Sequence, residues 1–152
     1  MTPSRLKETV VLDRIRWVRK MLTSLQDLPL KTWDAFNADD HISAAAESYL
    51  RRGLEALLDL GRHLLAKGFG VAPPEYKSIA ITLGEKGVLT KEQTALFIKM
   101  AGYRNRLVHF YHEISRKELY EICSQRLGDI ESILEAIQTW IDSHPQKIDR
   151  SL

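Results

Sequence analysis

A cluster of chemically versatile residues occupies positions 102–115, where the sequence reads GYRNRLVHFYHEIS. It contains two arginines, an asparagine, two histidines and two tyrosines. Histidine can give or take a proton near neutral pH, and arginine carries a permanent charge on a fork of hydrogen-bond donors. Together these side chains suit proton transfer beside an anion such as a phosphate.

The spacing of Arg104, Asn105 and His109 limits how their side chains can meet. Five helical positions correspond to a rotation of about 140°, so Arg104 and His109 point to different sides of one helix. They converge only if the helix ends near His109 or if a second copy supplies the partner. Asn105 lies four positions before His109, a spacing at which its amide can orient the imidazole. The dipole at a helix C-terminus would also favour protonated His109.

Local charge sets this segment apart from the rest of the chain. The whole sequence has a net charge of only +2, which excludes a polycation that coats nucleic acid without specificity. Between positions 97 and 117, however, five basic residues face one acidic residue, a net +4: Lys99, Arg104, Arg106, Arg116 and Lys117 against Glu113. A basic segment interleaved with tyrosine and histidine suits a nucleotide or a phosphodiester backbone.

The elements that must position this cluster are helices, because apolar residues recur at helical spacing and almost never alternate. The pattern predicts an all-α chain with helices over residues 4–28, 40–67, 76–86, 91 to about 108, and 116 to about 143. Glycines at 68 and 70 should stop the second helix, and Gly87 the third. Capping boxes begin the last two helices at Thr90 and Ser115. The cluster therefore straddles the end of the fourth of about five helices in a bundle.

Composition bounds the remaining possibilities. A chain of 152 residues with 44% hydrophobic content can bury one core, so we expect a single domain over residues 1–152. Cys123 is the lone cysteine and cannot form an internal disulfide, and the N-terminal sequence lacks a secretory signal. No apolar run is long enough to cross a bilayer. These features predict a cytoplasmic protein that does not enter membranes.

Simpler interpretations exist for several of these residues. Tyr103, Leu107 and Phe110 are packing residues, and a histidine near a helix end is often only a cap. His109 and His112 could be a metal pair, but no third ligand stands at helical spacing, so we expect no metal. Glutamates 47 and 55 are interpreted as solvated or salt-bridged, His63 as an ordinary helix residue, and tryptophans 17, 33 and 140 as core or dimer contacts.

The pattern Arg-Asn-x-x-x-His-x-Tyr, formed by Arg104, Asn105, His109 and Tyr111, resembles the HEPN superfamily. More narrowly it resembles the HepT-type toxins of type VII toxin–antitoxin systems. The helix order and the glycine–proline break after a long second helix also match. The resemblance thus covers most of the chain.

The resemblance implies a metal-independent, cofactor-free endoribonuclease with an active cleft at a homodimer interface. His109 would act as general base or acid, Arg104 would stabilise charge on phosphate oxygens, and Asn105 would orient the histidine or the phosphate. The expected product is a 2′,3′-cyclic phosphate end on messenger or transfer RNA. Further RNA-binding candidates are Lys99, Arg106, His112 and Arg116.

The resemblance also implies a regulatory partner. In the family the tyrosine equivalent to Tyr111 accepts AMP from a nucleotidyltransferase antitoxin of the MntA type. Two other functions stay open: a noncatalytic HEPN module that binds a nucleotide or dimerises beside a nucleotidyltransferase, and a helical interaction protein whose basic patch binds an acidic partner.

Overall fold

The computed structural model describes residues 2–109 and 114–151, with only the backbone of His109 included. These ranges contain seven α-helices: α1 (Glu8–Gln26), α2 (Trp33–Asn37), α3 (Asp40–Leu64), α4 (Tyr76–Glu85), α5 (Lys91–His109), α6 (Arg116–Gln125) and α7 (Leu127–Asp142). A π-helical segment, η1 (Leu65–Phe69), continues α3, and a 3-10 turn, η2 (Pro145–Lys147), follows α7. Two short strands, β1 (Leu6–Lys7) and β2 (Ile148–Asp149), pair in parallel. The predicted helical bundle is confirmed.

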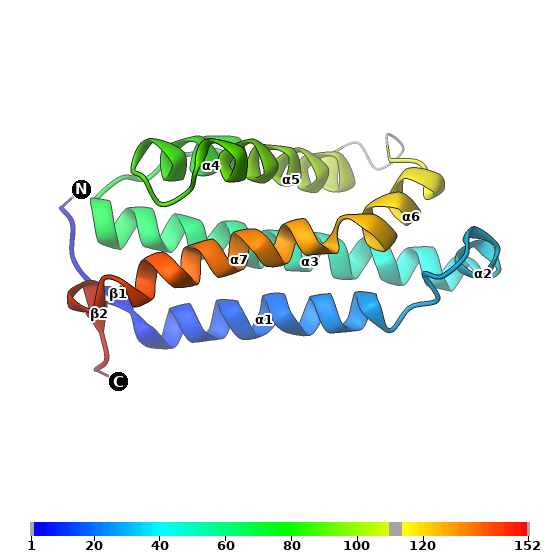
Figure 1. Cartoon of the computed structure of the whole chain (residues 1–152), viewed down its shortest axis with the longest axis horizontal. Coiled ribbons are helices and arrows are strands. Elements are labelled where there is room, and N and C mark those ends of the chain that lie inside the picture. The colour runs from blue at the N-terminus through cyan, green and yellow to red at the C-terminus, as the bar shows by residue number, and fades with distance from the viewer. Residues whose placement is uncertain (1, 110–113, 152) are drawn as a thin grey trace.

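The long helices lie roughly along the long axis of the molecule (Figure 1). Helix α3 occupies the centre, with α1 on one side, α4 and α5 on the other, and α7 across it. Strands β1 and β2 lie at one end of the bundle, whereas α2, α6 and the C-terminal end of α5 lie at the opposite end. The end of α5 that carries the Arg-Asn motif therefore lies at the same end of the bundle as α6, which follows it, and α2, which is distant from it in sequence.

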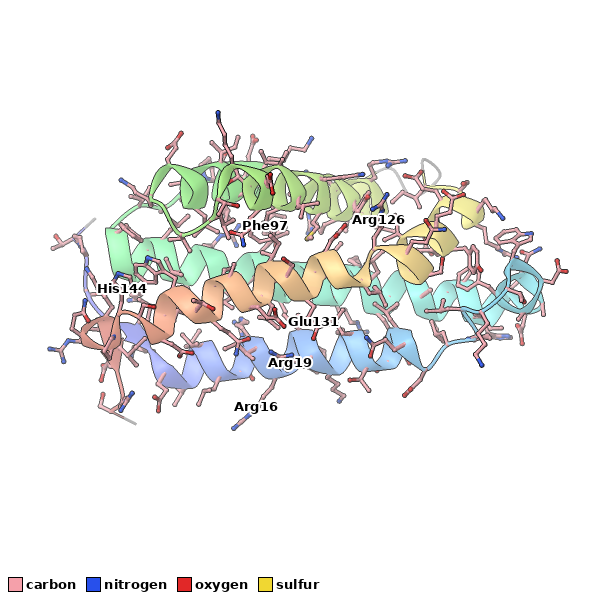
Figure 2. All side chains as sticks on the ribbon, in the orientation of Figure 1. Arg16, Arg19, Phe97, Arg126, Glu131 and His144 are labelled. Carbon is pink, nitrogen blue, oxygen red and sulfur yellow. The ribbon has the colours of Figure 1, made fainter. Side chains whose placement is uncertain are left out.

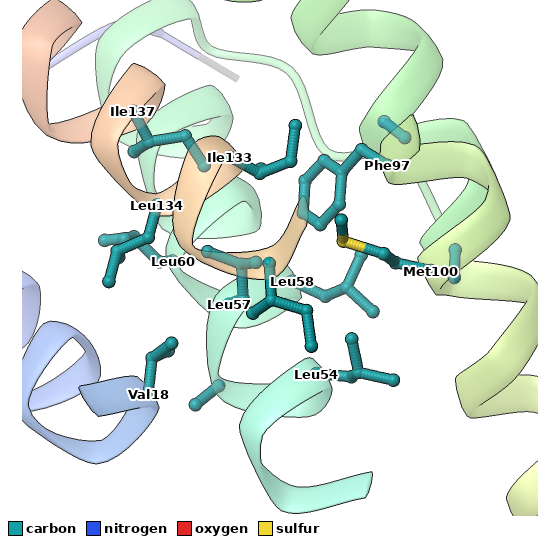
Figure 3. Close-up of a cluster of buried hydrophobic side chains, with 14 of the residues drawn as sticks. Val18, Leu54, Leu57, Leu58, Leu60, Phe97, Met100, Ile133, Leu134 and Ile137 are labelled. Atoms are coloured by element: carbon teal, nitrogen blue, oxygen red, sulfur yellow. The ribbon is translucent and has the colours of Figure 1, made fainter. Parts of the chain in front are cut away.

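The core forms where α3 meets its neighbours, because α3 buries side chains on most of its circumference. Figure 3 shows leucines of α3 packed against Val18 of α1, Phe97 and Met100 of α5, and the isoleucines of α7. A fully buried aromatic or aliphatic side chain contributes about 1.5–3 kcal/mol relative to an exposed one. This packing fixes the position of α5.

No helix among the described residues has the length and apolar character needed to cross a membrane.

The N-terminal and C-terminal ends of the chain differ from the helical prediction. The first helix begins at Glu8, not at Ser4, because residues 6–7 pair with residues 148–149. This two-residue parallel ladder is an exception to the predicted all-α content. A short helix, α2, was missed: Thr32 caps it by accepting a hydrogen bond from the Ala35 amide, and Phe36 is buried. Five residues are too few to show helical periodicity.

The end of the second predicted helix also differs. Helix α3 continues as the wider π-helical segment over residues 65–69, so Gly68 lies inside a helical turn and does not end the helix. Gly70 ends the segment with a φ of 67°, a left-handed conformation that glycine adopts without steric cost. Gly87 ends α4 in the same way with a φ of 77°. The predicted stops at these two glycines are confirmed.

The last predicted helix is in fact two helices. The chain breaks at Arg126, whose φ of −117° and ψ of 4° are not helical, and α7 begins at Leu127. Helix α6 consequently turns toward the motif end of the bundle while α7 follows α3 (Figure 1). The capping box predicted at Thr90 is confirmed, because Thr90 and Gln93 bond reciprocally at the start of α5. Of the box predicted at Ser115 one half forms: the Ser115 hydroxyl accepts from the Glu118 amide.

His63 anchors the N-terminal segment to α3 and should make the stability of the fold depend on pH. Its Nε2 accepts a hydrogen bond of 3.0 Å from the Lys7 amide, which requires a neutral imidazole. Burial, followed by the charges of Lys67 and Arg14, lowers the pKa of His63 below its usual 6.5. Below pH 6.5 the unfolded chain therefore binds more protons than the folded chain, so the free energy of unfolding should fall as the pH falls.

Urea unfolding of the wild type and of His63→Gln at pH values on either side of 6.5 tests this expectation. Glutamine can still accept the Lys7 hydrogen bond but does not titrate, so the variant should lose part of the acid destabilisation. An equal pH dependence in both proteins would contradict the assignment.

Candidate active site

The predicted catalytic residues lie at the C-terminal end of α5, which runs to His109 as the sequence indicated. Arg104, Asn105 and Arg106 are all partly exposed in its last turns. The side chain of His109 and residues 110–113, including Tyr111 and His112, lie outside the described part of the structure. The described side chains around the motif come from α3, α4 and α6.

Arg104 is held by two residues that are distant in sequence. Its guanidinium lies over the ring of Tyr76, the first residue of α4, with 4.6 Å between its Cζ and the ring centroid. Its Nη2 is 3.8 Å from Oε2 of Glu55 on α3. The side chain is only 18% exposed. Cation–π and ionic contacts of this kind restrict the guanidinium to one location.

The hydrogen-bonding capacity of Arg104 is not used up by these contacts. Its buried Nε has no hydrogen-bond partner among the described residues. The 3.8 Å separation between Arg104 and Oε2 of Glu55 is longer than a hydrogen bond. The other carboxylate oxygen of Glu55, Oε1, accepts a hydrogen bond from Arg51 at 2.7 Å. Leaving a buried donor unpaired costs about 1–3 kcal/mol. A fixed guanidinium with free donors is suited to bind an anion.

A row of charged residues along α3 supports this arrangement. Glu55 is salt-bridged, as the sequence indicated, and links Arg51 to Arg104. One turn further on, Asp59 contacts Arg62, whose guanidinium lies over Tyr76 at 5.0 Å. Burial raises the pKa of Asp59, opposed by Arg62. Sequence reasoning did not assign Glu55 or Tyr76 to the site, because only the fold brings α3 and α4 to Arg104.

Arg106 points to a different partner. Its two terminal nitrogens donate to the two carboxylate oxygens of Glu118 on α6, at 2.8 and 2.7 Å. These hydrogen bonds, together with nearby Lys99, hold the pKa of Glu118 below its usual range. The Glu118 side chain thus binds Arg106 and is not used for the reciprocal half of its predicted capping box.

Arg116 is separated from both arginines. It donates to Asn37 at 3.0 Å and to Asp40 at 2.9 Å, so it ties the start of α6 to the junction of α2 and α3. The basic segment seen in the sequence therefore divides among three places in the fold, beside Glu55, Glu118 and Asp40. Its positive charge is partly balanced by acidic residues that are remote in sequence.

Other candidate ligands and side chains have plain environments. Asn105 makes no hydrogen bond through its side chain to the described residues. Within residues 2–109 and 114–151, no group of three side chains is placed to bind a metal ion. The side chains of His109 and His112, the pair considered as metal ligands, lie outside the described part of the structure. Burial raises the pKa of Cys123 to about 12, which keeps the thiol protonated. Trp33 and Trp140 pack against other aromatic rings, whereas Trp17 is 38% exposed.

The helical bundle, with the Arg-Asn motif at the end of α5, defines a HEPN-type domain. The family model described as ribonuclease HepT-like matches residues 15–137, and the chain belongs to this family. A tRNA nuclease HepT of Aphanizomenon flos-aquae is 25% identical over 118 residues, which cover 74% of this chain and 80% of the relative. An mRNA nuclease HepT of Shewanella oneidensis is 20% identical over 129 residues, 85% of this chain and 96% of the relative.

Solved structures share the fold at low sequence identity. A tri-AMPylated HEPN toxin of Shewanella oneidensis in complex with the MNT antitoxin aligns with a TM-score of 0.77 and 20% identity, covering 86% of this chain and 97% of the toxin. YutE, a cytosolic protein of unknown function from Bacillus subtilis, aligns with a TM-score of 0.72 and 18% identity, covering 88% and 90%. The resemblance inferred from the sequence is confirmed.

Proposed function

We propose that this chain, as one domain over residues 1–152, is the ribonuclease toxin of a cytoplasmic type VII toxin–antitoxin system. Family membership and relatives named as tRNA and mRNA nucleases support an RNA substrate. The observation that carries the proposal is Arg104, whose guanidinium in the family motif is held in place by Tyr76 and Glu55. A guanidinium held in this way can stabilise the negative charge that develops on a phosphate oxygen in the transition state.

In the proposed reaction the ribose 2′-hydroxyl attacks the adjacent phosphorus and the 5′-oxygen leaves. His109 removes the proton from the 2′-hydroxyl or supplies one to the leaving oxygen, and Arg104 stabilises the phosphorane oxygens. Asn105 orients the imidazole or the phosphate. No metal ion takes part. The products are a 2′,3′-cyclic phosphate and a 5′-hydroxyl end.

The chemistry predicts characteristic RNA ends. Purified protein incubated with total RNA should produce fragments whose 3′ ends accept an adapter only after the cyclic phosphate is opened and removed, and EDTA should leave the rate unchanged. Loss of cleavage with EDTA, restored by a divalent cation, would contradict a metal-independent mechanism. Absence of any cleavage, with nucleotide binding retained, would favour the noncatalytic HEPN module that partners a nucleotidyltransferase.

The site is proposed to form in a homodimer. Arg104 and His109 are separated by about 140° around an ideal helix, so motifs from two copies can supply what one copy cannot. Val108 is 38% exposed at the end of α5 and lies in a hollow that Ala44, Ser48 and the charged residues Glu47 and Arg51 of α3 also line. A second copy placed there would bring two motifs together.

Mixed dimers test this assembly. Wild-type chains should behave as a dimer in light scattering, and Val108→Asp should shift them toward the 17.4 kDa monomer with loss of cleavage. Mixing Arg104→Ala chains with His109→Ala chains should restore part of the activity if one site uses residues from both copies. A fully active monomer would exclude a shared site.

A further inference from the structure

A second basic feature lies on the face of α5 that carries Arg106. A groove of about 460 Å³ runs between α5 and α6, and we call it the α5–α6 groove. Its charged lining consists of four basic and two acidic residues: Lys77, Lys99, Arg106, Arg126, Glu118 and Glu121. These come from α4, α5, α6 and the break between α6 and α7. The sequence placed only Lys99 and Arg106 together in one basic segment, and the fold adds Lys77 and Arg126 to them.

The charged residues of the groove differ in whether they form ion pairs with one another. Arg106 and Glu118 pair through two hydrogen bonds and largely neutralise each other. Lys77, Lys99 and Arg126 are exposed and form no ion pair with any residue in the described ranges. They face one remaining carboxylate, that of Glu121. The groove therefore has surplus positive charge that can attract a polyanion.

The shape of the groove also suits an extended chain of phosphates. Gly102 has no side chain, and the Lys77 side chain crosses above it, with its Cε 3.8 Å from where a Cβ would stand. The ring of Tyr103 lines the same groove and offers a surface on which a base can stack. Arg126 lies at the break between α6 and α7, on the side that faces α5, as Figure 2 shows. Cations on opposite walls can contact successive phosphates of one strand.

We propose that the α5–α6 groove binds the phosphodiester backbone of RNA beside the cleavage motif, through Lys77, Lys99 and Arg126. This inference rests on the proposed ribonuclease function and extends it to residues outside the motif. Arg106 lines the groove and lies two positions after Arg104 on α5, on a different side of the helix. Glu118 fixes Arg106, and Glu121 opposes binding of the anion. Backbone contacts of this kind position a strand without reading its sequence.

The test measures binding of a fluorescein-labelled single-stranded RNA by anisotropy over a range of salt concentrations, with all variants in a His109→Ala background. Lys77→Gln and Arg126→Gln should each weaken binding several-fold. Each lost phosphate contact should also reduce the slope of log K against log salt by about 0.7. Glu121→Gln should bind more tightly, because it removes a negative charge from the groove.

Arg16→Gln is the matched control. Arg16 is an exposed arginine of α1 and lies on the opposite edge of the molecule from Arg126 in Figure 2. It should bind RNA like the parent protein. If Lys77→Gln and Arg126→Gln also bind like Arg16→Gln, the groove proposal is wrong even when the wild type cleaves RNA normally.

Two further outcomes also overturn the proposal. If the groove variants are monomers in light scattering and bind RNA like the parent protein once their concentration is raised enough to form dimers, the groove is a contact between copies. If the wild type neither binds nor cleaves RNA, the proposed function fails and the groove proposal fails with it. Cleavage by the wild type therefore separates failure of the groove from failure of the enzyme.

Discussion

His109→Ala is expected to slow RNA cleavage by about 10²–10⁴-fold, the usual contribution of a positioned proton-transfer group. Arg104→Ala should cost about 10²–10³-fold, because a fixed donor to the transition-state oxygens is lost. Expression of the wild type alone should arrest growth, and both variants should relieve the arrest. Cleavage rates on one defined RNA, together with thermal unfolding of each variant, measure the two effects separately.

Arg62→Ala is the matched control for Arg104→Ala. Both arginines lie over the ring of Tyr76, at 5.0 and 4.6 Å, and both contact an acidic residue of α3. Each substitution therefore removes one cation–π contact and one ion pair, although the Arg104 side chain is more buried, 18% exposed against 42% for Arg62. Only Arg104 belongs to the motif, so Arg62→Ala should retain cleavage. An equal loss of cleavage in both variants would mean that the loss comes from disturbing the row of charged residues along α3, and not from removing Arg104 itself.

Arg104→Lys separates charge from geometry. Lysine keeps the positive charge but lacks the planar fork of donors, and it cannot place a donor where the buried Nε now lies. We expect activity well below wild type although the net charge is unchanged. Wild-type cleavage by either Arg104→Ala or His109→Ala would rule out the proposed mechanism.

The sequence predicted those parts of the fold that depend on local chemistry. The caps at Thr90 and Ser115 and the stops at Gly70 and Gly87 each rest on a few neighbouring residues, and the structure confirms them. The break at Arg126 was missed for a physical reason. Buried positions continue at spacings of three and four from α6 into α7, so the pattern reads as one helix: Leu119, Ile122, Cys123, Leu127, Ile130, Ile133, Leu134 and Ile137.

The surroundings of the candidate site could be predicted less well, because they depend on tertiary partners. Sequence alone shows that arginines 104, 106 and 116 are close together in the chain. It does not show that Glu55, Glu118 and Asp40 each bind one of them, since these acids lie on α3 and α6. A local count of charge therefore overestimates the free positive charge at the motif. It also misses Lys77 and Arg126, which only the fold brings to the α5–α6 groove.

Attachment of AMP to Tyr111 is expected to stop RNA cleavage. Tyr111 follows His109 by two positions, so a modification there would be introduced beside the proposed general acid or base. The tyrosyl oxygen would attack the α-phosphate of ATP bound by a nucleotidyltransferase antitoxin and release pyrophosphate. The new phosphodiester would carry a negative charge toward Arg104, compete with the RNA phosphate and occupy its volume. A related toxin from Shewanella oneidensis is described as tri-AMPylated in complex with its antitoxin.

Co-expression with a nucleotidyltransferase antitoxin of the MntA type, followed by intact-mass measurement, tests this regulation. The wild type should gain the mass of one or more AMP units and lose cleavage activity. Tyr111→Phe should gain no AMP and remain toxic in the presence of the antitoxin. Tyr103→Phe is the matched control, because Tyr103 belongs to the same sequence cluster but packs against the core, and it should be modified like the wild type.

The alternative is an antitoxin that blocks the toxin only by binding over the active cleft. Steric binding does not require a hydroxyl group at position 111, so Tyr111→Phe would then be neutralised without any gain in mass. Covalent inhibition differs in a second respect, since the modified toxin should stay inactive after the antitoxin is removed under denaturing conditions and the toxin is refolded. A phosphodiesterase that removes AMP should then restore cleavage, which a bound protein inhibitor cannot explain.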